Sequence, residues 1–274
     1  MTANAEQIDF WNGQAGETWV RSQDRLDKML NGLSNIVLTK ASTRPGERVL
    51  DVGCGCGATS LVLAKQGGIV HGVDVSAPML AHARQRAAKV DNLSFTEADA
   101  AVHDFEGAYQ LVFSRFGVMF FEDPFVAFKN LHAALASDGR LVFMCWQSPA
   151  NNPWVSTAGR VIAPFLDQAE APDPKAPGPF AFADESYLRD ILVQAEFRDI
   201  EIESVTLDLL VGDDLESAMR FQGEVGPLAR ALTELSDEKK VQALDAVRQV
   251  FSTQMTPSGL KLGGATWLVS AKAS

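Results

Sequence analysis

Short apolar runs alternate with segments of helical spacing along the first half of the chain. Apolar runs of strand length predict five strands, at residues 49–52, 69–75, 93–100, 109–121 and, after a turn, 137–147. Apolar residues that recur every three or four positions predict helices at residues 25–40, 58–66, 77–90 and 123–135. Such alternation indicates a parallel sheet covered by helices on both faces.

The pattern changes after residue 147. Seven prolines between residues 149 and 182 predict a loop-rich insertion with one helix near residues 154–168. Beyond it we expect a helix at 184–197, a strand at 198–210, two helices within 214–253 and a last strand at 264–273. Residues 1–274 should form a single domain. Its core is expected at about 41–148, 184–212 and 262–274, and a helical cap at about 1–40, 149–183 and 213–261.

Composition narrows the classes of partner. The 35 acidic residues exceed the 24 Lys and Arg residues, so the formal charge of -11 disfavours nucleic-acid binding. No apolar run of about 18 residues occurs, and we expect neither a membrane span nor a signal peptide. Three cysteines, two of them in one glycine-rich stretch, make a poor disulfide framework and favour a cytoplasmic protein. A homodimer is possible.

A glycine-rich turn follows the first predicted strand. Gly53, Gly55 and Gly57 would allow positive φ angles and let a ligand approach the main chain. A turn from strand to helix also presents free N–H groups, at the sheet edge where α/β proteins bind ligands. The alternative is that the glycines only let the helix pack tightly on its strand.

Two acidic residues end the next two predicted strands. Asp74 comes 17 residues after Gly57, and Asp99 comes 25 residues after Asp74. A carboxylate at the position of Asp74 can accept hydrogen bonds from both hydroxyls of a ribose. Alternatively, Asp74 stabilises only the dipole of the following helix. Together the two acids suit a nucleoside with a ribose and an amino-bearing base.

The nucleoside could belong to a nicotinamide cofactor or to another ligand. The spacing Gly53-x-Gly55-x-x-Ala58 is compatible with a dinucleotide fingerprint, which would indicate an NAD(P)-dependent oxidoreductase. Asp51 counts against it, because a carboxylate two residues before the first glycine is a poor neighbour for a pyrophosphate. The chain also ends in strand, helical insertion and strand instead of a second mononucleotide-binding half.

The motifs VLDVGCGCGATS, GVDVSAPMLAHAR, FTEADA, LVFSRFGVMFF and LHAALASDGRLVF occur in this order. Together they resemble the class I S-adenosylmethionine-dependent methyltransferases, most closely the branch of quinone-biosynthesis and other small-molecule enzymes. The resemblance covers about residues 45–147. It implies a Rossmann-like, seven-stranded, mostly parallel sheet whose last strand is antiparallel. It also implies S-adenosyl-L-methionine as cofactor and S-adenosyl-L-homocysteine as product.

The resemblance assigns roles around the methionine end of the cofactor. It implies backbone contacts from Gly53 and Gly55, with Cys54 between them at the same site. Asp51 would support the ammonium group, directly or through water.

For the adenosine end, the resemblance implies that Asp74 binds the ribose hydroxyls. Val75 and Met79 would line the adenine pocket. Asp99 would accept from the adenine amino group, and the Ala100 N–H would donate to the ring.

Further residues would face the reacting group or cover it. The resemblance implies that Ser114 and Arg115 face the sulfonium, and that Trp11 and Trp19 belong to a segment that folds over the cofactor. His103 and Arg115 are the weak candidates for catalysis, because methyl transfer by in-line displacement requires proximity and alignment but no protein nucleophile and no metal. Cys54 and Cys56 form a C-x-C pair without partner ligands, a poor zinc site.

The acceptor is expected to be a small, partly apolar molecule. Five aromatic or flexible apolar side chains are expected near the mouth of the site: Phe116, Met119, Phe120, Trp146 and Trp154. For Met119 and Phe120 the alternative is ordinary packing in the core. A protein that binds the cofactor without transferring methyl, as a partner of another protein, is the remaining alternative.

Overall fold

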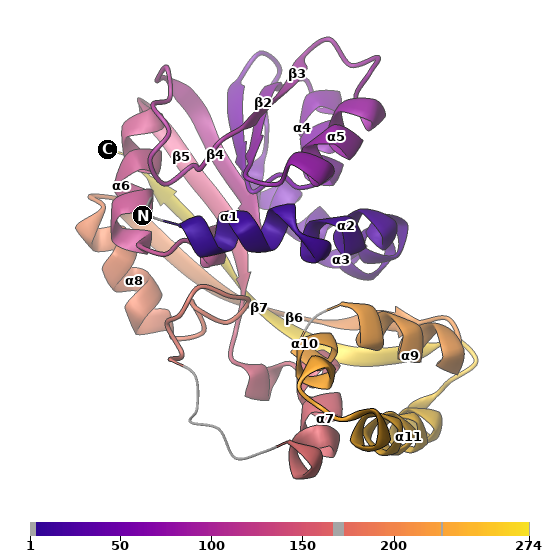
Figure 1. Cartoon of the computed structure of the whole chain (residues 1–274). Helices are drawn as coiled ribbons and strands as arrows, with labels where there is room; N and C mark the ends of the chain where they lie inside the picture. Colours follow the sequence, from indigo (N-terminus) through magenta and orange to yellow (C-terminus); the bar gives the residue numbers. More distant parts are fainter. Residues whose placement is uncertain (1–3, 167–172, 226, 274) are drawn as a thin grey trace.

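A computed structural model describes residues 4–166, 173–225 and 227–273 of the chain. Seven strands form one sheet in the order β3-β2-β1-β4-β5-β7-β6 (Figure 1). They are β1 (Arg48–Val52), β2 (Ile69–Asp74), β3 (Leu93–Glu97), β4 (Tyr109–Arg115), β5 (Leu135–Trp146), β6 (Arg198–Gly212) and β7 (Leu260–Lys272). The first five strands are parallel, and β7 runs antiparallel between β5 and β6. This arrangement confirms the predicted fold class.

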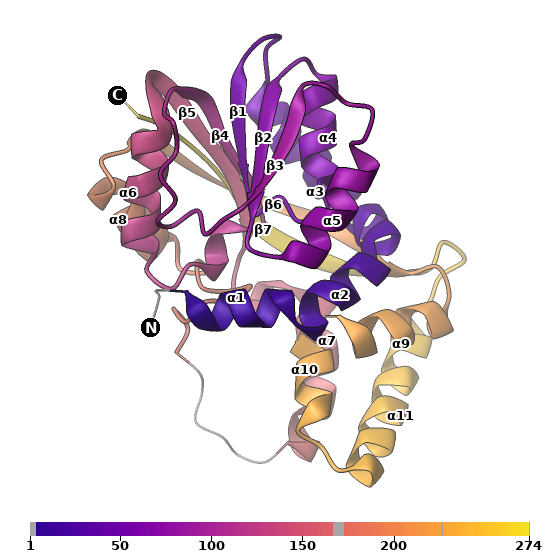
Figure 2. The same cartoon turned by 45° about the horizontal axis from the view of Figure 1, so that its top comes forward.

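Helices cover both faces of the sheet. On one face lie α3 (Gln23–Ala41), α4 (Ala58–Lys65) and α5 (Ala77–Arg86). On the other face lie α6 (Pro124–Ala134) and α8 (Glu185–Gln194), which pack against each other (Figures 1 and 2). The predicted helices at 25–40, 58–66, 77–90, 123–135 and 184–197 are therefore confirmed, with ends shifted by a few residues.

A second group of helices packs on the long ends of β6 and β7. It consists of α7 (Pro153–Ile162), α9 (Leu215–Glu224), α10 (Pro227–Thr233) and α11 (Asp237–Gln254). Figure 1 shows these helices below the sheet. No helix among the described residues is long and apolar enough to cross a membrane.

Several element boundaries differ from the predictions. The predicted strand 109–121 ends at Arg115 and is followed by a short 3-10 helix, η1 (Val118–Phe120), because Phe116 has a φ of +62° that no strand residue adopts. Residues 214–253 form three helices where two were expected. The helix near 154–168 ends at Ile162 before a 3-10 turn, η3 (Ala163–Phe165), that contains Pro164. Residues 167 and 168 of that prediction lie outside the described residues.

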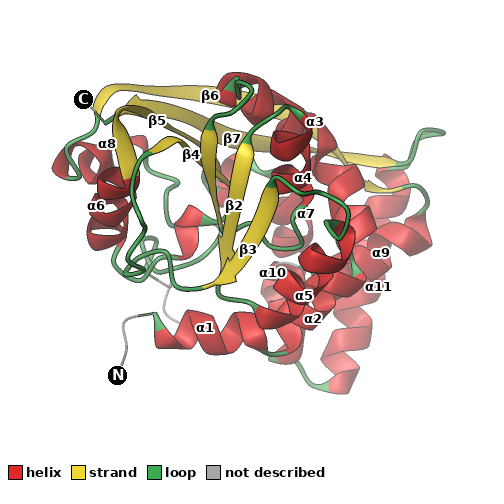
Figure 3. Cartoon of the chain, turned by 90° about the horizontal axis from the view of Figure 1, so that it is seen from above, coloured by secondary structure: helices red, strands yellow, loops and turns green. Residues whose placement is uncertain are grey.

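Two helices at the N-terminus were not predicted. They are α1 (Ala5–Asn12) and α2 (Gln14–Arg21), and of their residues only Gly16 is buried. Neither helix has the buried apolar stripe that makes α3 recognisable. In Figure 3, which looks at the sheet from above, both lie beside the ends of the parallel strands.

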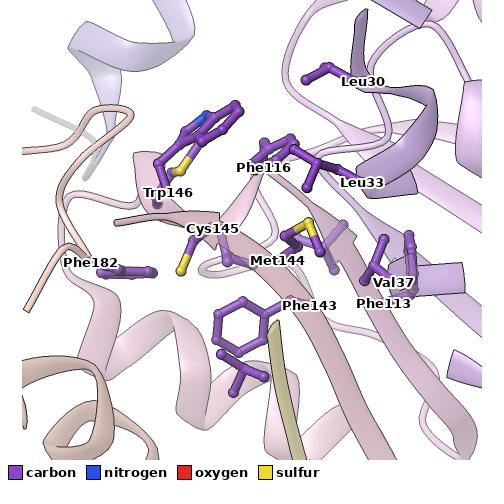
Figure 4. Packing of buried hydrophobic residues seen from close by; sticks show 14 of the residues in the cluster. Leu30, Leu33, Val37, Phe113, Phe116, Phe143, Met144, Cys145, Trp146 and Phe182 are labelled. Atoms are coloured by element: carbon purple, nitrogen blue, oxygen red, sulfur yellow. The ribbon is translucent and has the colours of Figure 1, made fainter. Parts of the chain in front are cut away.

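Core packing between α3 and the strands β4 and β5 determines how the ends of these strands are positioned. Leu33 and Val37 of α3 are fully buried, and their side chains point toward Phe113 of β4 and Met144 of β5 (Figure 4). Burial of each such side chain contributes about 1.5–3 kcal/mol. Because these contacts hold α3 against β4, they determine where Arg115, at the end of β4, lies relative to α3.

Candidate functional site

A cavity of about 110 Å³ lies where the parallel strands β1 to β4 end. Most of its wall comes from residues at the ends of these strands or just after them, namely 52–56, 73–75, 98–100 and 115–117. The N-terminal helices add a second wall with Asn4, Gln7, Trp11, Trp19, Gln23 and Leu30. The cavity therefore occupies the edge of the sheet at which the sequence predicts a ligand.

The three glycines of the loop serve two purposes. All have positive φ, between +53° and +74°. A Cβ on Gly53 would meet the backbone of Gly117 at 2.7 Å, and a Cβ on Gly57 would meet the ring of Phe95 at 2.9 Å. A Cβ on Gly55 would find only the Met79 sulfur, at 3.8 Å. Tight packing thus requires Gly53 and Gly57, whereas Gly55 leaves the main chain open to the cavity.

Asp51 lies buried beneath this loop and does not line the cavity. Its Oδ2 accepts hydrogen bonds from Thr59 Oγ1 at 3.0 Å and Ser60 Oγ at 2.6 Å. Its Oδ1 has no hydrogen-bond partner among the described residues. Burial raises the pKa of Asp51 to about 6, against the opposing effects of the two hydroxyls and of Arg115.

Asp74 connects the second strand to the glycine loop. Its Oδ2 accepts from the Gly55 N–H at 2.8 Å, and its Oδ1 accepts from the Ser76 N–H at 2.9 Å. Burial raises its pKa. The bond to Ser76 at the start of α5 agrees with the alternative role at the helix dipole. A carboxylate has about four acceptor positions, so Asp74 can still accept from a ligand in the cavity that it lines.

Asp99 and Ala100 line the same cavity beyond the third strand. Asp99 Oδ1 accepts from the Ala101 N–H at 3.0 Å, whereas its Oδ2 is buried without a partner. A buried acceptor without a partner is costly unless a ligand or water satisfies it. Val75 and Met79, expected at an adenine pocket, also line the cavity.

The two residues at the end of β4 point in different directions. Ser114 is fully buried, donates to the Val52 carbonyl at 2.8 Å and does not line the cavity. Arg115 does line it, and its Nη1 donates to Ser34 Oγ on α3 at 2.8 Å. Burial lowers the pKa of Arg115. Neighbouring residues of a strand point to opposite sides, which separates these two side chains.

The N-terminal helices are held over the cavity by aromatic and polar contacts. The Trp11 ring lies 5.2 Å from the Phe120 ring and 5.8 Å from the Trp19 ring, centroid to centroid. Asn12 Nδ2 donates to the Val75 carbonyl at 2.8 Å, and Ser76 Oγ donates to the Trp11 carbonyl at 2.7 Å. These contacts place Trp11 and Trp19 in the cavity wall.

The remaining candidates for catalysis or metal binding are a histidine and two cysteines. His103 does not line the cavity, and its ring packs edge-on against Phe105. Cys54 and Cys56 line the cavity, and burial raises the pKa of both thiols, to about 12 for Cys56. No group of three or more His, Cys, Asp or Glu residues in the described parts of the chain could hold a metal ion.

The aromatic residues expected at the mouth divide into two sets. Phe116 and Phe120 line the cavity, whereas Met119, Trp146 and Trp154 do not. Met119 is a core residue, 2% exposed. The Phe116 and Trp146 rings stack with their centroids 4.4 Å apart, and the Trp146 ring also contacts the tilted ring of Trp154 on α7 at 4.9 Å.

Sequence reasoning missed several lining residues, of which Asn4, Gln7 and Gln23 are polar. No motif marks them. They reach the cavity because α1, α2 and the start of α3 fold back over strands that are distant in sequence.

Comparison with known proteins agrees with this geometry. A family model described as a methyltransferase domain matches residues 49–139. Aklanonic acid methyltransferase DauC of Streptomyces sp. is 35% identical over 36% of this chain and 47% of its own length. Demethylmenaquinone methyltransferase of Thermus thermophilus is 38% identical over 38% of this chain and 49% of its own length. The chain thus matches about half the length of these curated relatives.

A solved structure shows the same fold over most of the chain. Phosphoethanolamine N-methyltransferase 2 of Haemonchus contortus, in complex with S-adenosyl-L-methionine, has a TM-score of 0.56 at 19% identity, and the match covers 88% of this chain and 52% of that protein. Residues 49–139 therefore match a methyltransferase domain, and the chain shares its fold with a methyltransferase of known structure.

Proposed function

We propose that this protein transfers a methyl group from S-adenosyl-L-methionine to a small-molecule acceptor. One observation carries the proposal: the glycine loop, Asp74 and Asp99 follow three neighbouring strands and line one cavity. The match of residues 49–139 to a methyltransferase family model supports it. Two relatives support it as well, because they are named as methyltransferases of aklanonic acid and of demethylmenaquinone. The structural neighbour with S-adenosyl-L-methionine bound adds support for this cofactor.

The residues of the cavity fit this cofactor. The unpartnered Oδ2 of Asp99 is an acceptor for an adenine amino group, and Asp74 has free acceptor positions for ribose hydroxyls. The open side of Gly55 admits a ligand to the main chain. Asp51 would support the ammonium group from beneath the loop through its unpartnered Oδ1.

When bound, S-adenosyl-L-methionine supplies a methyl group activated by a sulfonium. The protein's contribution is to hold the two reactants in line and to exclude water. Phe116 and Phe120 give the cavity an aromatic wall, and Trp11 covers it from α1. A wall of this kind suits a partly apolar acceptor, and the charge of -11 disfavours a nucleic-acid acceptor. A homodimer and a cytoplasmic location stay predictions, the latter supported by three free cysteines.

Titration calorimetry tests the cofactor. We expect saturable binding of S-adenosylhomocysteine and none of NAD. The Asp74→Ala variant should bind S-adenosylhomocysteine about 100-fold more weakly, because two charge-assisted hydrogen bonds are lost. Asp190→Ala, on the exposed face of α8, is the matched control. NAD binding without S-adenosylhomocysteine binding would contradict the proposal.

A second measurement separates an enzyme from a protein that only binds the cofactor. Incubation of the protein with methyl-labelled S-adenosyl-L-methionine and a small-molecule extract should label a fraction that a heat-inactivated sample leaves unlabelled. Tight binding with no labelled product in extracts rich in quinones and aromatic acids would favour the non-catalytic alternative.

A further inference from the structure

Phe116 adopts a backbone conformation that is rare for an aromatic residue. Its φ of +62° lies in the left-handed region, which is strained for a residue with a Cβ. The Phe116 N–H donates to the Met144 carbonyl at 2.9 Å, and the next residue, Gly117, packs against Gly53. Backbone contacts on two sides therefore hold this turn in place. Strain that the surroundings retain in this way is concentrated at functional sites.

The positive φ determines on which side of the sheet the Phe116 ring lies. Side chains alternate along a strand, so a regular continuation of β4 would place Phe116 opposite to Arg115. Instead, both side chains line the cavity. In Figure 4 the Phe116 ring lies toward Leu30 and Leu33 of α3, the helix on which Arg115 contacts Ser34. The strained turn thus adds an aromatic ring to the cavity wall.

Two tryptophans support this ring from behind. The planes of Phe116 and Trp146 are nearly parallel, at 6°, with the ring centroids 4.4 Å apart. The Trp146 ring contacts that of Trp154, whose indole N–H donates to Asn152 Oδ1 at 3.1 Å. Asn152 is fully buried and forms two hydrogen bonds with the backbone of Ala265. Because neither tryptophan lines the cavity, they hold Phe116 without themselves reaching a ligand.

The part of the Phe116 ring that is left free by this stack faces the cavity. Four other aromatic side chains line the same cavity: Trp11, Trp19, Phe120 and Phe121. Trp11 is edge-on to Trp19 and to Phe120, with interplanar angles of 80° and 89°. Rings fixed at such angles present both faces and edges to a ligand. A planar aromatic ligand gains from stacking and edge contacts beyond the burial of its area, whereas a saturated ring gains from burial alone.

The order of the strands leaves Phe116 to the acceptor. The adenosine-binding candidates Asp74 and Asp99 come at the ends of β2 and β3, whereas Phe116 follows β4, on the other side of β1. We propose that the acceptor is a planar aromatic molecule and that Phe116 is the residue against which its ring packs. Trp146 is a positioning residue that acts through Phe116. The inference rests on the proposed function.

The test compares two probes that differ in aromaticity. 2-Naphthol and 2-decalol have the same fused-ring skeleton and one hydroxyl each, but only 2-naphthol is aromatic and planar. Their binding to the protein saturated with S-adenosylhomocysteine is measured by titration calorimetry. We expect the wild-type protein to bind 2-naphthol about 3- to 10-fold more tightly, the effect of aromatic contacts beyond burial.

Variants of Phe116 then assign the preference to its ring. In Phe116→Leu the preference should fall below about twofold, with unchanged affinity for S-adenosylhomocysteine. Phe116→Tyr retains the ring and should retain the preference, which keeps the test informative if Phe116→Leu does not fold. Phe125→Leu is the matched control, because the Phe125 ring contacts the Tyr187 ring at 6.0 Å and does not line the cavity.

Variants of Trp146 test the positioning role. Trp146→Leu removes the stacked ring behind Phe116 and should lower the preference about as far as Phe116→Leu does. Trp146→Phe retains a ring in the stack and should restore the preference. A merely structural role would weaken the binding of both probes alike, and thermal melting of each variant reports folding separately.

Several results would overturn the inference. They include equal or absent binding of the two probes by the wild-type protein, an unchanged preference in Phe116→Leu, and an equal loss of affinity for both probes. If Phe116→Leu instead weakens binding of S-adenosyl-L-methionine but not of S-adenosylhomocysteine, the ring contacts the sulfonium as a cation–π partner and not the acceptor. A wild-type protein that does not bind S-adenosylhomocysteine contradicts the proposed function itself, a result distinct from loss of the preference.

Discussion

Asp51 should make cofactor binding depend on pH in a range where an exposed aspartate would not. Burial raises the pKa of its carboxyl from 3.8 to about 6. In the proposed arrangement the ammonium group of the cofactor would interact favourably with the ionised carboxylate, so the ligand would bind the ionised form preferentially. Binding should therefore weaken as pH falls through about 6 and should release a proton from the protein there.

The size of the effect follows from the pKa. If only the ionised form binds, the apparent Kd is multiplied by 1 + 10^(pKa − pH), which is about 1.1 at pH 7 and about 11 at pH 5. Affinity should thus fall about tenfold over these two units. Stability without ligand should show the opposite trend, because the raised pKa favours the protonated folded state. The contribution of Asp51 is fully present below about pH 4, and about 3 kcal/mol is lost by pH 6.

Calorimetry with S-adenosylhomocysteine between pH 5 and 7.5, in two buffers of different ionisation enthalpy, measures both the affinity and the released proton. Asp74 faces the same cavity, and burial raises its pKa as well, so the variant Asp51→Asn is needed to separate the two carboxyls. In Asp51→Asn, affinity should be lower and its pH dependence shallower. An affinity that is constant from pH 5 to 7 in the wild-type protein would refute the argument, as would an identical profile in the variant.

Three further substitutions probe the loop, the distant core and the N-terminal helices. Gly53→Ala should lower the free energy of unfolding in urea by about 2 kcal/mol or more, because the new Cβ would meet the backbone of Gly117. Gly46 also has a positive φ but has open space around it, so the control Gly46→Ala should lower it by only about 1 kcal/mol. Phe251→Ala, in the fully buried face of α11, should cost about 3–5 kcal/mol in the same assay. Trp11→Ala removes the ring that packs on Phe120, so stopped-flow binding should show faster association and dissociation of S-adenosylhomocysteine; unchanged rates would contradict that role.

The succession of strands and helices along the chain and the place of the site were predictable because each depends on local pattern, whereas the antiparallel last strand was expected only from the family resemblance. A glycine turn follows the first buried apolar run, an acidic residue follows each of the next two, and parallel strands bring their carboxyl ends to one edge. The directions of individual side chains were less accessible. Ser114 lies near the end of β4, yet its hydroxyl donates to the Val52 carbonyl beneath the cavity. Alternation along a strand predicts that neighbouring residues diverge, but not which of them faces the ligand.

The contribution of α1 and α2 could not be read from the sequence for a different reason. Their apolar residues are few and partly exposed, so no helical stripe marks them. What holds them is long-range: Asn12 contacts the end of β2, and the Trp11 carbonyl accepts from Ser76, 65 residues away. Such contacts exist only after the sheet has formed. The place of Gln23 in the cavity wall was unpredictable for the same reason, since the rest of that wall comes from distant segments.

The two walls of the cavity therefore differ in how firmly they are held. The wall formed by the strand ends packs on the fully buried core, and within this wall Gly53 packs directly against Gly117. The wall of α1 and α2 rests on aromatic edges and a few hydrogen bonds, several of them exposed. The cavity of about 110 Å³ is smaller than the 300–1,000 Å³ usual for ligands of cofactor size, so one wall must move for such a ligand to enter. Displacing the strand ends would break core packing, whereas displacing α1 breaks aromatic edge contacts and a few hydrogen bonds. Entry past α1 is therefore the lower-energy route, and the rates measured with Trp11→Ala test it.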